Sequence, residues 1–108
     1  MKVSRDSQGD AAIYSVEGQV DMHTSPELRS ALKQGLLDKS SPIVVDLGGV
    51  TFIDSSGLAT LIEALQAVGR YGGKLRLCGL SPEVRKLFDL ARLNEVFDLR
   101  DDREQALR

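Results

Sequence analysis

The sequence predicts a single α/β domain, a mixed sheet of about four or five strands with helices packed mainly on one face. Short apolar runs rich in β-branched residues alternate along the chain with longer segments whose apolar residues recur at helical spacing. Strands that alternate with helices pair in parallel through right-handed crossovers, whereas an opening hairpin adds an antiparallel pair. The chain has 108 residues, so we assign residues 1–108 to one domain.

The predicted strands are short and apolar. The turn cluster Ser7–Asp10 separates the first two and therefore indicates a hairpin. The run Ile43 to Leu47 is bounded by Pro42 and Gly48, and its β-branched content favours a buried strand. In chain order the predicted strands are Val3 to Arg5, Ala11 to Val16, Ile43 to Leu47, Leu75 to Cys78 and Glu95 to Leu99.

Three longer helices are predicted from apolar residues that recur on one face. The first begins either with a capping box of Thr24 and Glu27 or with Ser25 as the N-cap before Pro26. A last helical turn is expected after Asp101-Asp102. The predicted apolar faces are Leu28, Ala31, Leu32 and Leu36, then Leu58, Leu61, Ile62, Leu65 and Val68, and then Val84, Leu87, Phe88 and Ala91.

Composition favours a protein of the cytoplasm. The 14 basic and 16 acidic residues give a net charge of −2, so no basic excess attracts nucleic acid. No apolar run approaches the roughly 20 residues that cross a bilayer, and no secretion leader is recognisable at Met1. The single cysteine, Cys78, lies in a predicted strand and is expected to be a small buried apolar residue. We therefore expect no membrane insertion and no direct contact with nucleic acid.

Two polar clusters are the candidate functional positions. Asp21-Met22-His23-Thr24 follows the second strand, and Asp54-Ser55-Ser56-Gly57 precedes the second helix. Function in open α/β sheets gathers at the carboxyl ends of strands, so we expect Asp21 within side-chain reach of Ser55. A helix N-cap explains one Asp or Ser but not three in a row, and the pattern alone leaves cap and functional site as alternatives.

Phosphorylation is one chemistry that the second cluster can support. A helix N-terminus carries partial positive charge and free N–H donors, so it tolerates an added phosphate. A phosphoserine there adds roughly −1.5 to −2 charge at pH 7 beside Asp54. The outer surface would thus change its charge without unfolding of the domain.

The sequence supports a catalytic function less well than a phosphorylation site. The segment Asp54 to Gly57 is not a G-x-S-x-G nucleophile elbow, and no phosphate-binding glycine loop or zinc-binding cluster occurs. The only histidine, His23, is expected to be an exposed loop residue, although a Ser55–His23–Asp21 arrangement stays as an alternative. We predict a protein without enzymatic activity and without a cofactor or metal.

The two clusters together resemble the STAS domain family, and in particular its anti-sigma factor antagonists. Gly18 to Thr24 followed by Leu28-Arg29 is similar to the family pattern of glycine, aspartate and threonine before a Leu-Arg pair. Ile43 to Leu47 followed by Phe52 to Leu58 is similar to the family's signature segment. The resemblance covers nearly the whole chain and implies a STAS-like mixed sheet.

The resemblance also implies a partner switch. In that family an antagonist binds an anti-sigma factor with serine kinase activity, is released when a serine is phosphorylated, and is restored by a phosphatase. The accepting serine corresponds to Ser55. The implied partner-binding residues are Asp21, His23, Thr24, Asp54, Ser55, Ser56, Gly57 and Leu58. Alternatives are an accessory subunit of a lipid-transporting ABC system, the tail of an anion transporter, or a hydrolase.

Overall fold

A five-stranded sheet with the strand order β1-β2-β3-β4-β5 forms the centre of the protein. This computed structural model describes all 108 residues. The strands are β1 (Lys2–Gln8), β2 (Ala11–Val20), β3 (Ile43–Ile53), β4 (Leu75–Cys78) and β5 (Asp98–Arg100). β1 pairs with β2 as an antiparallel hairpin, and every later neighbour pair is parallel. The predicted mixed sheet is confirmed.

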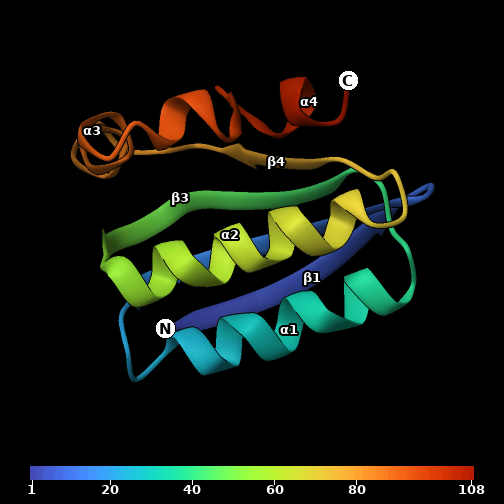
Figure 1. Cartoon of the computed structure of the whole chain (residues 1–108), viewed down its shortest axis with the longest axis horizontal. Helices are drawn as coiled ribbons and strands as arrows, with labels where there is room; N and C mark the ends of the chain where they lie inside the picture. Colours follow the sequence, from blue (N-terminus) through green and yellow to red (C-terminus); the bar gives the residue numbers. More distant parts are fainter.

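The helices lie where the apolar periodicity predicted them, but the apolar face of the third is narrower than predicted, because Leu87 and Ala91 are exposed. They are α1 (Ser25–Leu37), α2 (Ser55–Gly69), α3 (Pro82–Leu90) and the short α4 (Arg103–Ala106), with a 3₁₀ turn η1 (Leu93–Glu95) after α3. Figure 1 shows α1 and α2 side by side in front of the sheet, running in the same direction. Each helix that follows a parallel strand returns the chain to the same end of the sheet. None of the four is both long enough and apolar enough to cross a membrane.

Most of the core lies between the sheet and the three longer helices. It contains Leu28 and Leu32 of α1, Leu61 of α2 and Phe88 of α3, all essentially inaccessible to solvent. The other face of the sheet carries a small cluster of Ile13, Val44, Cys78 and Ala106, over which α4 lies. The prediction of helices mainly on one face is therefore confirmed, and so is the burial of Cys78.

Three strands are longer than predicted. β1 extends from Lys2 to Gln8, which leaves only Gly9-Asp10 for the turn, and β2 and β3 continue because glycines allow irregular pairing. β2 runs on to Val20 through Gly18, whose φ of +93° favours glycine. β3 runs on to Ile53 through Gly48-Gly49, where a Cβ at Gly49 would lie 2.7 Å from Glu17 Cγ. Register shifts mark both places. The extensions of β2 and β3 carry the strand ends to the two polar clusters.

The last strand was predicted too early in the chain. Leu93–Glu95 forms the 3₁₀ turn, and the strand begins at Asp98 rather than Glu95. Arg92 precedes the turn in the left-handed conformation, with φ of +59°. The residues before Asp98 therefore turn the chain instead of extending it.

Candidate functional site

The two polar clusters lie side by side at one end of the sheet. Val20 and Ile53, the last residues of β2 and β3, are register partners in the parallel ladder. The Asp54 backbone N–H then donates to the Val20 carbonyl oxygen at 3.0 Å. This bond joins the last residue of β2 directly to the first residue after β3. The structure thus brings Asp21 and Ser55 to the same end of the sheet, as the topology predicted.

Asp54 is the N-cap of α2. Its Oδ1 accepts hydrogen bonds from the backbone N–H groups of Ser56 at 2.9 Å and Gly57 at 3.2 Å. The same oxygen accepts the Ser56 hydroxyl at 2.6 Å. One carboxylate thus satisfies two N–H groups that the first helical turn leaves without partners.

The cap fixes the ionisation of Asp54. The Ser56 hydroxyl lowers the pKa of the Asp54 carboxyl below its ordinary value, and the N–H groups of Gly57, Ser56 and Met22 act in the same direction. Partial desolvation opposes them without reversing the shift. Asp54 is therefore a carboxylate at neutral pH, and the helix N-terminus already holds one negative charge.

Ser55 and Ser56 differ in what their hydroxyls do. The Ser56 hydroxyl is engaged by Asp54, and its side chain is half-buried. Ser55, the first residue of α2, is exposed, and its hydroxyl has no hydrogen-bond partner in the chain. Of the two neighbouring hydroxyls, only that of Ser56 is held by a hydrogen bond within the chain.

Asp21 and Thr24 build the neighbouring loop. Asp21 Oδ1 accepts the backbone N–H groups of His23 at 2.9 Å and Thr24 at 3.1 Å. The Thr24 hydroxyl accepts the Asp21 N–H and donates to the Gln19 carbonyl oxygen, each at 2.9 Å. Thr24 is the N-cap of α1 by position, but its side chain makes no capping bond, and Ser25 is already the first helical residue. Both predicted starts, the Thr24–Glu27 capping box and the Ser25 N-cap, are therefore wrong. The Thr24 hydroxyl makes its hydrogen bonds within the loop instead.

No hydrogen bond joins Asp21 to Ser55 or His23 to Ser55. The His23 side chain is exposed, and only its backbone N–H contacts the Asp21 carboxylate. The Ser55–His23–Asp21 arrangement is therefore not assembled here. The Asp21 carboxylate stabilises its own loop. Asp21 and Ser55 lie at the same end of the sheet because the Asp54 N–H is bonded to the Val20 carbonyl oxygen.

Gly57 and Leu58 face the domain rather than the solvent. A Cβ at Gly57 would lie 2.7 Å from Ile53 Cγ1 and 2.8 Å from Val20 Cγ1, so the first turn of α2 packs directly on the two strand ends. Leu58 is half-buried against the core. The glycine is required by internal packing, whether or not a partner also approaches it.

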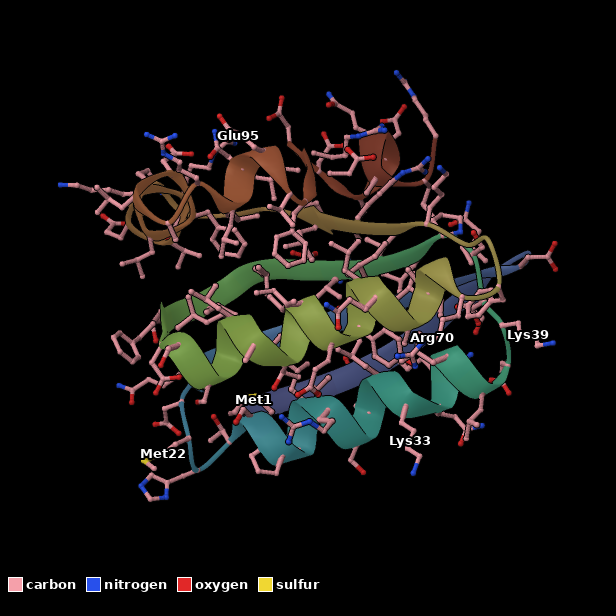
Figure 2. All side chains as sticks on the ribbon, viewed as in Figure 1. Met1, Met22, Lys33, Lys39, Arg70 and Glu95 are labelled. Atoms are coloured by element: carbon pink, nitrogen blue, oxygen red, sulfur yellow. The ribbon has the colours of Figure 1, made fainter.

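Two apolar side chains at this end were not singled out from the sequence as binding residues. Met22 is 69% exposed and Phe52 is 46% exposed. Phe52 is register partner to Gln19, one residue before the strand ends, and Met22 follows two residues after Val20. Figure 2 shows Met22 extending away from the body of the domain. Met22 stands inside the polar cluster Asp21–Thr24, which was the available signal, whereas Phe52 lies between apolar residues and nothing in the sequence marks it as exposed.

This arrangement of sheet, helices and capped helix N-terminus defines a small α/β domain of a known family. The model of the STAS domain matches residues 2–106, so the chain belongs to the STAS domain family. It is 25% identical over 108 residues to an anti-sigma F factor antagonist of Paenibacillus polymyxa, covering 99% of this chain and 92% of that one. It is 29% identical over 85 residues to an anti-sigma-B factor antagonist of Bacillus subtilis, covering 79% and 77%.

Solved structures show the same fold. An anti-sigma factor antagonist from Mycobacterium paratuberculosis superimposes with a TM-score of 0.89 at 27% identity, over 98% of this chain and 90% of that one. The phosphorylated form of the Bacillus cell fate determinant SpoIIAA superimposes with a TM-score of 0.74 at 18% identity, over 98% and 96%. The expected STAS-like fold is confirmed.

Proposed function

We propose that this protein is an anti-sigma factor antagonist that binds an anti-sigma factor through the end of the sheet around Ser55. Phosphorylation of Ser55 by that partner, acting as a serine kinase, releases it, and a phosphatase restores it. The protein itself is a non-enzymatic regulator in the cytoplasm. The names of the relatives and the geometry of the serine pair support this proposal.

The observation that carries the proposal is the free Ser55 hydroxyl beside the engaged Ser56 hydroxyl. A kinase needs an exposed oxygen that can attack a phosphoryl group, and Ser55 offers one at the first position of a 15-residue helix. Ser56 would have to give up its bond to Asp54 first. The geometry therefore favours Ser55 over Ser56 as the acceptor.

A phosphate on Ser55 changes the surface more than the fold. Asp54 already occupies the first-turn N–H groups of Ser56 and Gly57, so the phosphate has to lie outward, next to an existing carboxylate. The local charge then becomes more negative by roughly 1.5 to 2 units. A partner that covers this end meets the added charge, and like charges at an interface cost several kcal/mol.

Met22 and Phe52 supply the apolar part of the same surface. Exposed apolar side chains beside a charged switch are typical of interfaces, where a few large residues carry much of the affinity. The proposed contact surface therefore joins these two residues to Asp21, His23, Thr24, Asp54, Ser55, Ser56 and the exposed part of Leu58, with Gly57 reached only through its backbone.

The test is incubation with the cognate anti-sigma factor and ATP, followed by mass mapping of the phosphopeptide. We expect one phosphate, on Ser55, in the wild type and in Ser56→Ala, and none in Ser55→Ala. Phosphate found on Ser56 or Thr24 would identify that residue, rather than Ser55, as the phosphate acceptor. If no residue is phosphorylated and the protein instead binds a transporter ATPase, the lipid-transport role replaces this proposal.

A further inference from the structure

A groove of about 310 Å³ lies between α1 and α2, beyond the surface assigned above. Its lining from α1 is Arg29, Leu32, Lys33 and Leu36, and its lining from α2 and the following residue is Thr60, Glu63, Ala64, Gln66, Ala67 and Arg70. The helices run alongside each other here, as Figure 1 shows. Of its apolar lining residues, Leu32 and Ala64 are buried beneath the surface, whereas Leu36 and Ala67 are half-buried and can be reached by an incoming side chain.

The charge of the groove is opposite to that of the whole protein. Three lining residues are basic and one is acidic, whereas the chain carries a net charge of −2. The acidic residue, Glu63, is already paired with Arg29 at 2.8 Å. Lys33 and Arg70 have no acidic partner. In Figure 2 the Arg70 side chain lies between the ends of α2 and α1, and Lys33 extends from the outer side of α1.

The groove is continuous with the Ser55 end through the exposed ridge of α2. Ser55, Ala59, Glu63, Gln66 and Arg70 are all exposed and recur at helical spacing along that ridge. From Ser55 to Arg70 it extends for about 22 Å, at 1.5 Å per residue. A partner seated on Ser55 that follows α2 therefore comes to the groove.

We propose that the groove is a second docking surface for the same partner, and that it takes an acidic segment bearing short apolar side chains. The apolar groups of the segment rest on the accessible parts of Leu36 and Ala67, and its carboxylates lie near Lys33 and Arg70. This inference rests on the proposed function, because it takes its partner from there. It adds a contact that phosphorylation of Ser55 does not itself alter.

The test uses the purified full-length protein and the anti-sigma factor that phosphorylates Ser55. Calorimetric titration compares the wild type with Lys33→Glu, Arg70→Glu and the control Arg108→Glu, which makes the same charge change at the C-terminus beside α4, on the other side of the sheet. We expect about fivefold or greater loss of affinity for each groove variant at low ionic strength, and a smaller loss at about 0.15 M salt. The control should bind within about twofold of the wild type, and thermal unfolding should confirm that all variants are folded.

Two failures are distinguishable. If Ser55→Glu weakens binding while both groove variants bind like the wild type, the groove is not a docking surface and the proposed function stands. If the wild type neither binds the anti-sigma factor nor takes up phosphate, the proposed function fails, and the inference fails with it. Equal losses in Arg108→Glu and the groove variants would show only a general charge effect and would also overturn the inference.

Discussion

The Ser56 hydroxyl donates a 2.6 Å hydrogen bond to the same Asp54 oxygen that caps α2. This contact makes the two adjacent serines differ in the hydrogen bonding of their hydroxyls. Ser56 strengthens the helix cap, whereas Ser55 is exposed and its hydroxyl makes no hydrogen bond within the chain.

The serine pair predicts unequal effects of two alanine substitutions on stability. Ser56→Ala should lower the free energy of unfolding, because Asp54 loses a hydrogen-bond donor. Ser55→Ala should change the free energy of unfolding by less than about 0.5 kcal/mol, because its side chain makes no bond. Urea unfolding followed by circular dichroism measures both. A larger loss for Ser55→Ala than for Ser56→Ala would contradict the assignment.

The cap also predicts a dependence of stability on acidity. The pKa of Asp54 in the folded protein is below its ordinary value of 3.8, so its ionised form is favoured by folding. That contribution is fully present above the ordinary pKa and is lost as pH falls through the lowered one. Asp54→Asn should flatten the fall in stability below about pH 4. Identical pH profiles for wild type and Asp54→Asn would refute the lowered pKa.

The core predicts unequal costs for two neighbouring residues of α2. Leu61 is fully buried between α2 and the sheet, and Ile62 is half-exposed. Leu61→Ala should therefore cost about 2–5 kcal/mol of unfolding free energy, and Ile62→Ala clearly less. Chemical denaturation of the two variants checks the difference, and equal costs would mean that the packing of α2 is described wrongly.

The burial of Cys78 predicts that its thiol is protected from reagents in the folded state. Burial raises the pKa of its thiol to about 11, so the reactive thiolate is scarce at neutral pH. A thiol reagent should label it slowly in buffer and rapidly in denaturant. Above about pH 9 the unfolded chain can ionise this group and the folded chain cannot, so stability should fall with rising pH and fall less in Cys78→Ala. Equal labelling rates in buffer and denaturant would show that α4 leaves the thiol open.

The order of strands and helices was predictable because it depends on local patterns. Apolar spacing located α1, α2 and α3, and parallel topology placed Asp21 and Ser55 at one end of the sheet. The lengths of β2 and β3 were not predictable in this way. They depend on register shifts between neighbouring strands, which no single segment of sequence records.

The finer features of the site depend on three-dimensional contacts. The sequence Asp54-Ser55-Ser56 contains two equivalent hydroxyls, and only the geometry of the cap engages Ser56 and frees Ser55. The groove beside Arg70 likewise depends on how far apart α1 and α2 pack. Residues that face each other only after folding cannot be paired from spacing along the chain.

The most direct test of the account is the affinity of the anti-sigma factor for the protein before and after phosphorylation of Ser55. Calorimetric titration should show a loss of about a hundredfold or more on phosphorylation, which corresponds to about 2.7 kcal/mol. Ser55→Glu should show a smaller loss, since it adds about half the charge, and Ser55→Ala should bind like the wild type. Equal affinity of the phosphorylated and unphosphorylated proteins would contradict the claim that Ser55 is the switch.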